Sequence, residues 1–215
     1  MRKYLSEFIG TFFIVLCGTG TMVLDQHTGG GVSPFGISLT FGVGVTLMIL
    51  VFNKSSGAHF NPAVTLGFSM VGLFPKKEIL PYIISQLFGA IAASILLRFL
   101  FPANENLGAT LPLGSEGQSF FLELVLTFLL MWIVLWFSQT TKLMPFTALA
   151  IGLTVGLEAY FGGPISGASM NPARSIAPAI VSGHLESLWV YISAPILGTV
   201  IAVVGWKYPS VFDGF

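Results

Sequence analysis

The sequence predicts an all-α membrane protein in which six membrane-spanning helices and two short re-entrant helices form an inverted repeat. Three observations lead to this fold class. The 215 residues are 54% hydrophobic and only 8% charged, whereas a soluble domain carries roughly 25% charged residues. Six apolar stretches are long enough to cross a bilayer. The tripeptide Asn-Pro-Ala occurs once in each half of the chain, starting at Asn61 and at Asn171.

The spanning helices are predicted from length, because a helix needs about 20 mostly apolar residues to cross a bilayer. Two shorter apolar stretches begin at the Asn-Pro-Ala copies, at 61–71 and 171–181. Ten helical residues cover only about 15 Å, so each would reach half-way through the hydrocarbon layer of about 30 Å. The six long stretches are 4–24, 34–53, 79–101, 118–139, 145–162 and 187–206.

Both short stretches open with the pattern Ser-Gly-Ala-x-x-Asn-Pro-Ala, which ends in Asn61-Pro62-Ala63 and Asn171-Pro172-Ala173. Asn is a favoured N-cap, and Pro is well tolerated at the first helical position. At membrane depth an unpaired backbone group costs several kcal/mol, so such a helix start must line a wet path or be buried in protein. The pattern therefore indicates either a solute site at the midplane or two ordinary caps at re-entrant turns.

The two halves of the chain repeat one another. Residues 7–12 resemble 123–128, and Pro-Phe opens both the second and the fifth span. Each half holds three spans, an odd number, so the second half must be inverted in the membrane. We expect one channel domain over 1–215, with repeats of approximately 1–105 and 115–215, and with the two Asn-Pro-Ala starts meeting near its centre.

Charge sets the predicted orientation. Basic residues gather on one side of the six-span arrangement, and the positive-inside rule then places both termini in the cytoplasm. Arg98 and Arg174 are the exceptions. The basic residues on the predicted cytoplasmic side are Arg2, Lys3, Lys54, Lys76, Lys77, Lys142 and Lys207, and the acidic residues opposite are Asp25, Glu105, Glu116 and Glu186.

Opposed helix starts would have an electrostatic consequence. Each helix N-terminus carries roughly half a positive charge, so two facing N-termini would repel cations. Asn61 and Asn171 would cap their helices through their side-chain oxygens and offer amide N–H groups to a central water, which would break any proton relay. Arg174 would cost at least about 2.5–3.5 kcal/mol in lipid. We therefore expect it to line an aqueous constriction, the alternatives being a snorkelling side chain or a structural ion pair.

These motifs resemble those of the aquaporin, or major intrinsic protein, family over essentially the whole chain. The stretches 161–175 and 188–192 resemble most closely the nodulin-like branch of that family. The resemblance implies a passive homotetrameric channel for water and small uncharged solutes, with glycerol foremost and urea or neutral metalloid acids as further candidates. It implies no enzyme activity, cofactor, metal or nucleic-acid partner, and a cell membrane (inner or plasma) as the location.

The resemblance also implies a selectivity filter. By spacing from the two Asn residues, its four positions here are Phe41, Ala159, Ala168 and Arg174. Water-selective relatives usually carry His at the Ala159 position and a Cys or Thr, or a residue that exposes a carbonyl, at the Ala168 position. Glycerol facilitators tend to carry Trp and Phe at the Phe41 and Ala168 positions. The two alanines predict a wider and less polar aperture than that of a water-only channel.

Four further residues receive predicted roles. In the family, the acids at the positions of Glu7 and Glu123 hold the re-entrant loops by hydrogen bonds to the backbone, and we favour this over proton relay. His59 is expected to shape the cytoplasmic pore mouth. Glu158 is expected either to bond the backbone of the outer loop or to face the outer vestibule. The competing functions are a strictly water-selective channel, a secondary active transporter with broken helices and, more remotely, a membrane enzyme.

Overall fold

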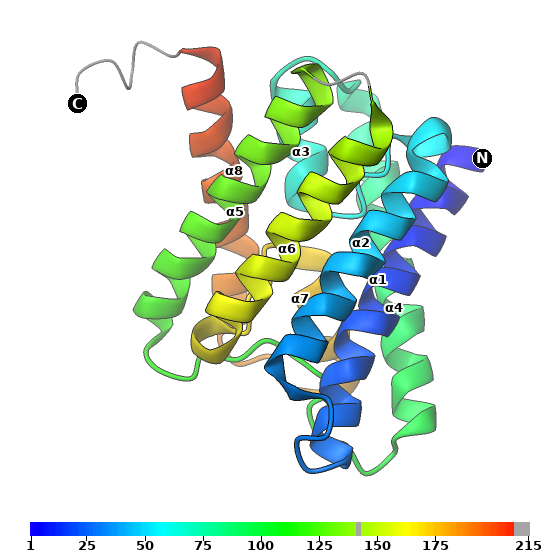
Figure 1. The fold of residues 1–215 in the computed structure, drawn as a ribbon, viewed down its shortest axis with the longest axis vertical. Helices are drawn as coiled ribbons and strands as arrows, with labels where there is room; N and C mark the ends of the chain where they lie inside the picture. Colours follow the sequence, from blue (N-terminus) through cyan, green and yellow to red (C-terminus); the bar gives the residue numbers. More distant parts are fainter. Residues whose placement is uncertain (141–142, 209–215) are drawn as a thin grey trace.

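A computed structural model describes residues 1–140 and 143–208, and within these residues every regular element is a helix (Figure 1). The helices are α1 (Arg2–His27), α2 (Ser33–Ser56), α3 (Pro62–Met70), the 3₁₀ turn η1 (Lys76–Glu78), α4 (Ile79–Leu100), α5 (Glu116–Thr140), α6 (Met144–Ser166), α7 (Pro172–Ser182) and α8 (Leu188–Lys207). Six of them are long and apolar enough to cross a membrane, with η1 counted as part of α4. The predicted fold class of six spans and two short helices is confirmed.

The two helices that lead into the Asn-Pro-Ala segments run further than predicted. The prediction ended the second span at residue 53 and the fifth at 162, whereas α2 reaches Ser56 and α6 passes through Pro164 to Ser166. Both end at a glycine in the left-handed region, Gly57 at φ 85° and Gly167 at φ 83°. Glycine adopts this conformation without a Cβ clash and so ends a helix sharply. The Gly of each repeated Ser-Gly-Ala therefore turns the chain into the segment before Asn-Pro-Ala.

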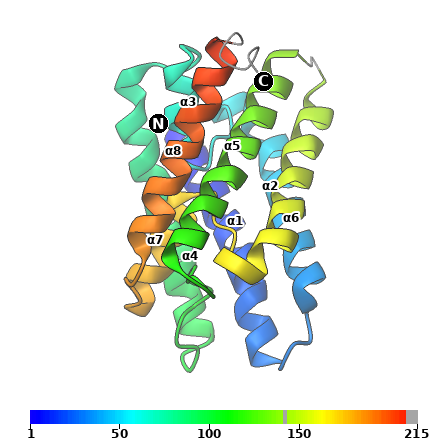
Figure 2. The same ribbon diagram turned by 90° about the vertical axis from the view of Figure 1, so that its left-hand side faces the viewer.

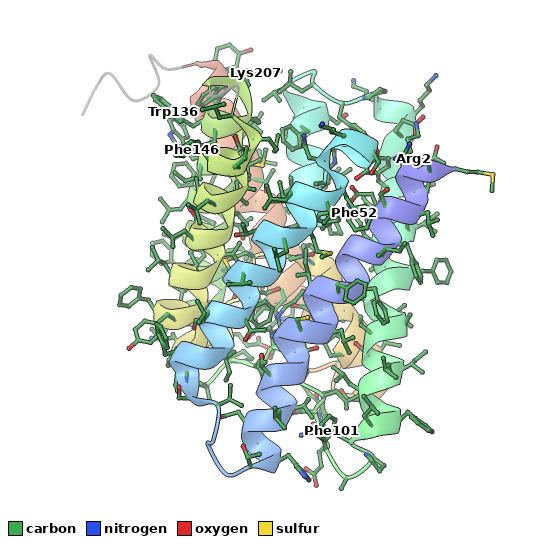
Figure 3. The ribbon with its side chains drawn as sticks, turned by 45° about the vertical axis from the view of Figure 1, so that its right-hand side comes forward. Arg2, Phe52, Phe101, Trp136, Phe146 and Lys207 are labelled. Atoms are coloured by element: carbon green, nitrogen blue, oxygen red, sulfur yellow. The ribbon has the colours of Figure 1, made fainter. Side chains whose placement is uncertain are left out.

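The long helices run side by side, and the two short helices lie against α4 and α8, with α3 toward one end of the molecule and α7 toward the other (Figure 2). Arg2 and Lys207 lie at the same end, and Phe101 lies at the opposite end (Figure 3). The chain therefore begins and α8 finishes on one side of the bundle. Lys142, which the sequence placed on that side too, lies outside the described residues.

The helix pairs follow the predicted repeat. α1 packs along α4 in the first half, as α5 packs along α8 in the second, and α2 packs against α6 between the halves. The short helices cross over, since α3 contacts α8 and α7 contacts α4. Each half therefore supplies part of the surface on which the short helix of the other half packs. This packing brings the two Asn-Pro-Ala starts together.

Close helix crossings occur at equivalent glycines of the repeat. A Cβ at Gly89 of α4 would overlap the carbonyl oxygen of Phe8 in α1, and one at Gly198 of α8 would overlap that of Leu124 in α5. Small residues at such crossings let helix backbones approach closely, which drives association in lipid. These contacts set the distance between the helices that carry Glu7 and Glu123 and their partners.

We expect Gly89→Ala to lower the thermal unfolding midpoint in detergent, because the added methyl group has no room between α4 and α1. Overpacking of this kind costs roughly 1–3 kcal/mol. Gly44→Ala in α2 is the matched control, since nothing lies within 4 Å of a Cβ there and alanine favours helix by about 1 kcal/mol over glycine. Equal midpoints for the two variants would contradict the crossing described above.

Candidate functional site

A cavity of about 280 Å³ lies between the two short helices and the long helices around them. Its wall on α2 is one helix face, from Asn53 to Phe41, and its wall on α6 runs from Met144 to Ala159. At about 1.5 Å of rise per residue, these faces extend roughly 20 Å along the bundle. The α2 and α6 walls are mainly apolar. The segments 57–61 and 168–171, which precede the two short helices, also line the cavity.

The two asparagines cap the short helices. Oδ1 of Asn61 accepts from the backbone N–H of Ala63 at 2.8 Å, and Oδ1 of Asn171 accepts from that of Ala173 at 3.0 Å. Both asparagines are extended and each is followed by Pro at the first helical position. The positive ends of the α3 and α7 dipoles therefore begin at two residues that line the cavity.

Each asparagine also holds the opposite loop. Nδ2 of Asn61 donates to the carbonyl oxygen of Met170 at 2.8 Å, and Nδ2 of Asn171 donates to that of Phe60 at 2.9 Å. A side-chain amide has two N–H donors, so one donor of each asparagine is used across the repeat axis and one is left for the cavity. The sequence predicted that each asparagine would cap its helix and donate to a central water, but nothing in it predicted this reciprocal tie.

The loops before the asparagines are strained in the same way in both halves. Ala58 and Phe60 have φ of 55° and 51°, and Ala168 and Met170 have φ of 42° and 53°. A non-glycine residue in the left-handed region costs on the order of 1–3 kcal/mol and persists only where its surroundings impose it. Those surroundings are supplied by two buried acids.

In the first half the acid is Glu7, which is fully buried. Its carboxylate accepts from the Ser56 hydroxyl at 2.7 Å and from the backbone N–H groups of His59 at 3.0 Å and Phe60 at 2.7 Å. Gln86 of α4 donates to the same carboxylate at 2.8 Å. Four donors thus surround a group that would otherwise be very costly to bury.

In the second half Glu123 occupies the equivalent place and is also fully buried. It accepts from the Ser166 hydroxyl at 2.7 Å and from the backbone N–H groups of Ser169 at 2.8 Å and Met170 at 2.9 Å. These contacts to the loop backbone are the ones that the predicted role in loop support requires.

The four predicted filter residues come together on the cavity wall from four parts of the fold. Phe41 comes from α2, Ala159 from α6, Ala168 from the second loop and Arg174 from α7. The guanidinium carbon of Arg174 lies 5.3 Å from the centre of the Phe41 ring. That ring packs so closely on Gly18 of α1 that a Cβ there would overlap it. The ring therefore has a fixed position beside the arginine.

Arg174 is only 2% exposed and is held by two acceptors. Nη1 donates to the carbonyl oxygen of Gly108 at 2.8 Å, and Nη2 contacts the sulfur of Met22 at 3.0 Å, whereas the buried Nε has no partner. The ion pairs found among residues 1–140 and 143–208 do not include Arg174. Neither the snorkelling nor the ion-pair alternative describes its contacts.

Glu158 has neither of its predicted positions. It is buried, it does not line the cavity, and both of its carboxylate oxygens lack a partner in the part of the chain that the structure describes. Helix phase does not explain this, because a rotation of about 100° per residue puts Glu158 only about 60° from Val155, which lines the cavity. His59 does line the cavity, with its ring stacked on Phe68 at 4.8 Å between centres.

Sequence reasoning missed the residues that hold the ends of α2 and α6. The hydroxyl of Tyr82 donates to the carbonyl oxygen of Ser56 at 2.8 Å, and that of Tyr191 donates to the carbonyl of Ser166 at 2.7 Å. A signal was present, because the third and sixth spans share a tyrosine seven residues before the crossing glycine. Gly108 and Met22 carried no such signal.

Comparison with known proteins agrees with this geometry. A profile of the family described as major intrinsic protein matches residues 1–206. Aquaporin NIP1-1 of Zea mays is 39% identical over 210 residues, which cover 97% of this chain and 74% of that protein. Nodulin-26 of Glycine max is 36% identical over 213 residues, which cover 98% and 78%. The X-ray structure of the aquaglyceroporin from Plasmodium falciparum superposes with a TM-score of 0.87 at 27% identity, covering 96% of this chain and 95% of that one.

We expect Glu123→Gln to destabilise the protein and to reduce water flux per vesicle, because the amide would turn an N–H donor toward backbone donors of the second loop. An unsatisfied buried donor costs about 1–3 kcal/mol. Glu158→Gln is the matched control, since the Glu158 carboxyl makes no hydrogen bond to lose. Thermal unfolding in detergent and osmotic shrinkage of proteoliposomes measure both effects. A loss as large in the Glu158 variant would count against loop support by Glu123.

Proposed function

This chain belongs to the major intrinsic protein family, and on that premise we propose a passive channel for water, glycerol and similar small neutral solutes that holds back protons and ions. The protein is a multi-pass membrane channel and not an enzyme. The observation that carries the proposal is that both capping asparagines and Arg174 line one cavity. Solutes would cross down their gradients, since nothing in this arrangement calls for energy coupling.

Ion exclusion is proposed to arise at two levels. At the centre, the N-termini of α3 and α7 present positive dipole ends to the cavity, and the free N–H groups of Asn61 and Asn171 donate to a passing water. A water that accepts from both cannot pass a proton along a continuous chain. Beyond it, the buried guanidinium of Arg174 adds a full positive charge in a low-dielectric wall, where its field on a cation is strong.

The solute range is proposed from the composition of the wall. The faces of α2 and α6 are mainly apolar, while the loops before the short helices add the two asparagines. A polyol has a carbon backbone on one side and hydroxyls on the other. Its carbons can therefore face the apolar helices while its hydroxyls, like water, bond the polar groups of the loops. The small side chains of Ala159 and Ala168 leave room beside Phe41 and Arg174. The aquaglyceroporin neighbour supports glycerol as a solute, against the strictly water-selective alternative.

A secondary active transporter is the competing class, because broken helices also occur there. Such a protein needs a site for a coupling ion. Glu158, the acid beyond the repeated pair that such a site would require, does not line the cavity. Glu7 and Glu123 are occupied in holding the loops. These placements favour the channel.

We further propose a homotetramer in a cell membrane, with a cavity inside each subunit and both termini in the cytoplasm. The outward faces of the spans carry large apolar side chains such as Phe35, Phe88 and Leu153, which suit lipid or neighbouring subunits. The end that holds Arg2 and Lys207 (Figure 3) is the basic one. Chemical cross-linking tests the assembly, and reporter fusions at each terminus test the orientation.

The decisive measurement compares water, glycerol, urea and a neutral metalloid acid such as boric acid in one reconstituted preparation by stopped-flow light scattering. We expect fast water flux with a low activation energy, and glycerol flux clearly above that of empty vesicles. Water flux no faster than from empty vesicles would overturn the channel. Water flux without glycerol flux would leave the strictly water-selective alternative. Solute uptake that follows an imposed proton gradient would favour the transporter.

We expect Ala159→His to lower glycerol permeation more than water permeation, because the ring would narrow the cavity wall beside Arg174 and add a polar group. Ala159→Ser is the control, since it adds polarity with little volume, and its glycerol-to-water ratio should stay near that of the unaltered protein. If the histidine variant kept that ratio as well, Ala159 would have no part in the filter.

A further inference from the structure

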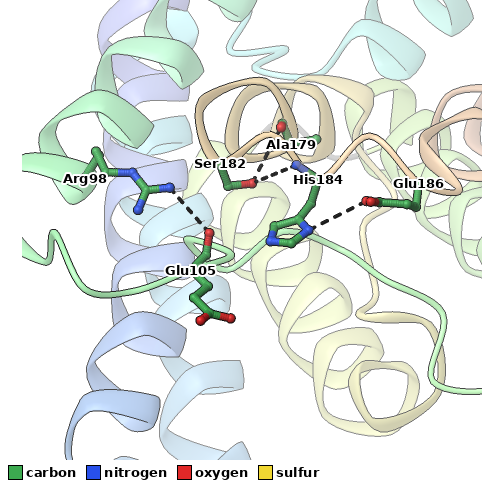
Figure 4. A network of polar contacts seen from close by, with 6 residues as sticks. All are labelled: Arg98, Glu105, Ala179, Ser182, His184 and Glu186. Carbon is green, nitrogen blue, oxygen red and sulfur yellow. Dashed lines mark hydrogen bonds and ion pairs between the residues drawn. The ribbon is translucent and has the colours of Figure 1, made fainter.

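Arg98 lies on the predicted outer side, and the proposed channel function gives it no role. It lies in the last turn of α4, where a cation is favoured by the helix dipole. Its guanidinium donates to the carbonyl oxygens of Asn104 at 2.6 Å and Glu105 at 3.3 Å, with a longer contact to Pro102 at 3.5 Å. Figure 4 shows the reach from Arg98 to Glu105. The side chain thus gathers the backbone of the segment that follows α4.

The side chain of Asn104 connects the start of this segment to α1 and to its later residues. Its Nδ2 donates to Gln26 at the end of α1 at 2.8 Å, and its Oδ1 accepts from the backbone N–H of Leu107 at 2.7 Å. Leu107 is fully buried and has φ 51°. Gly108 follows at φ 70°, with Thr19 of α1 against the position that a Cβ would take. Each step from Arg98 to Gly108 is therefore held by a contact.

The segment ends on the filter. The carbonyl oxygen of Gly108 accepts from Nη1 of Arg174 at 2.8 Å, and the hydroxyl of Thr110 donates to that of Ser175 on α7 at 2.7 Å. Within residues 1–140 and 143–208, the other acceptor at the guanidinium is the thioether of Met22, and sulfur is a weak acceptor. The orientation of Arg174 therefore depends mainly on one carbonyl of this segment.

We propose that Arg98 is a positioning residue for solute selection: it fixes the outer segment 101–108 so that the Gly108 carbonyl keeps the Arg174 guanidinium in place at the cavity wall. The inference rests on the proposed role of Arg174 in the filter. Without Arg98 the segment loosens, the guanidinium gains freedom, and the aperture between Arg174 and Phe41 widens on average. The permeability to glycerol then rises relative to the permeability to water, and proton leak rises.

The chain supplies its own control. Lys207 is the repeat counterpart of Arg98, since the spacing that relates Tyr82 to Tyr191 also relates Arg98 to Lys207. Lys207 is the basic residue in the last turn of α8, at the opposite end of the bundle. Lys207→Gln removes the same charge from the same place in the other repeat and touches no part of the filter.

The experiment measures the glycerol-to-water permeability ratio of proteoliposomes, which does not depend on how many channels have folded. Arg98→Gln should raise this ratio about threefold to tenfold, the scale of one lost hydrogen bond. Arg98→Lys, which keeps donors for the carbonyls, should recover most of the shift. Asn104→Ala removes the next link, the side-chain bonds to Gln26 and to the backbone N–H of Leu107, and should move the ratio in the same direction. Lys207→Gln should leave it unchanged.

Double variants separate this inference from the proposed function. Arg174→Val alone should raise the ratio and the proton leak, and Arg98→Gln should add nothing in that background, because coupled residues are not additive. A shifted ratio for Arg174→Val with unchanged ratios for Arg98→Gln and Asn104→Ala would overturn the role of Arg98 and leave the filter intact. An unchanged ratio for Arg174→Val would overturn the filter itself. A further shift by Arg98→Gln in the Arg174→Val background would show that Arg98 acts elsewhere.

Discussion

The structure depends on one demand of the bilayer: every backbone N–H and C=O at membrane depth needs a partner. This requirement is hardest to meet where the two short helices start near the middle of the protein, because each helix start exposes N-terminal N–H donors with no helical partner. Asn61 and Asn171 meet part of it by capping, and each asparagine also ties the carbonyl of the opposite loop. Glu7 and Glu123 meet much of the rest, and only a buried carboxylate could accept from a hydroxyl and two backbone donors at once. The passage exists because these ties hold the loops against the cavity.

The two repeats are held by similar contacts. Where these contacts differ, the two ends of the cavity differ in how their loops are supported. Gln86 donates to both Glu7 and Thr65, whereas Pro195 stands at its repeat position and has no donor to offer. The second loop is held instead from outside, through Ser175 and Thr110 and through the contact of Arg174 with Gly108. The end of the cavity at α3 therefore closes on its own helices, with His59 and Phe68 on the wall. The end at α7 depends on a segment between the repeats, and this end carries the charge of Arg174.

The chemistry of selection follows from the same division. Backbone groups and amides occupy one side of the cavity because the loops must be there, and apolar faces of α2 and α6 occupy the other because those helices pack at close range through Gly42, Gly152 and Gly156. A neutral solute can replace its lost hydrogen bonds to water along the polar side of the cavity, and its apolar part can contact α2 and α6. A cation finds positive helix ends and a guanidinium, so its desolvation is not compensated.

Length and composition alone determined the six spans, because a hydrocarbon layer of fixed thickness sets the number of apolar residues that a helix needs. The repeated Asn-Pro-Ala determined the two short helices and their caps, since capping is a local property of a few adjacent residues. The resemblance to the family, carried onto this chain by spacing from the two asparagines, pointed to Phe41, Ala159, Ala168 and Arg174, which do share one cavity wall. Only the tertiary structure decided that Glu158 is buried without lining the cavity, that each asparagine holds the opposite loop, and that Gly108, Met22 and Arg98 stand behind Arg174. The surroundings of a buried side chain and the path of an irregular segment depend on contacts between residues far apart in the chain, which no local pattern encodes.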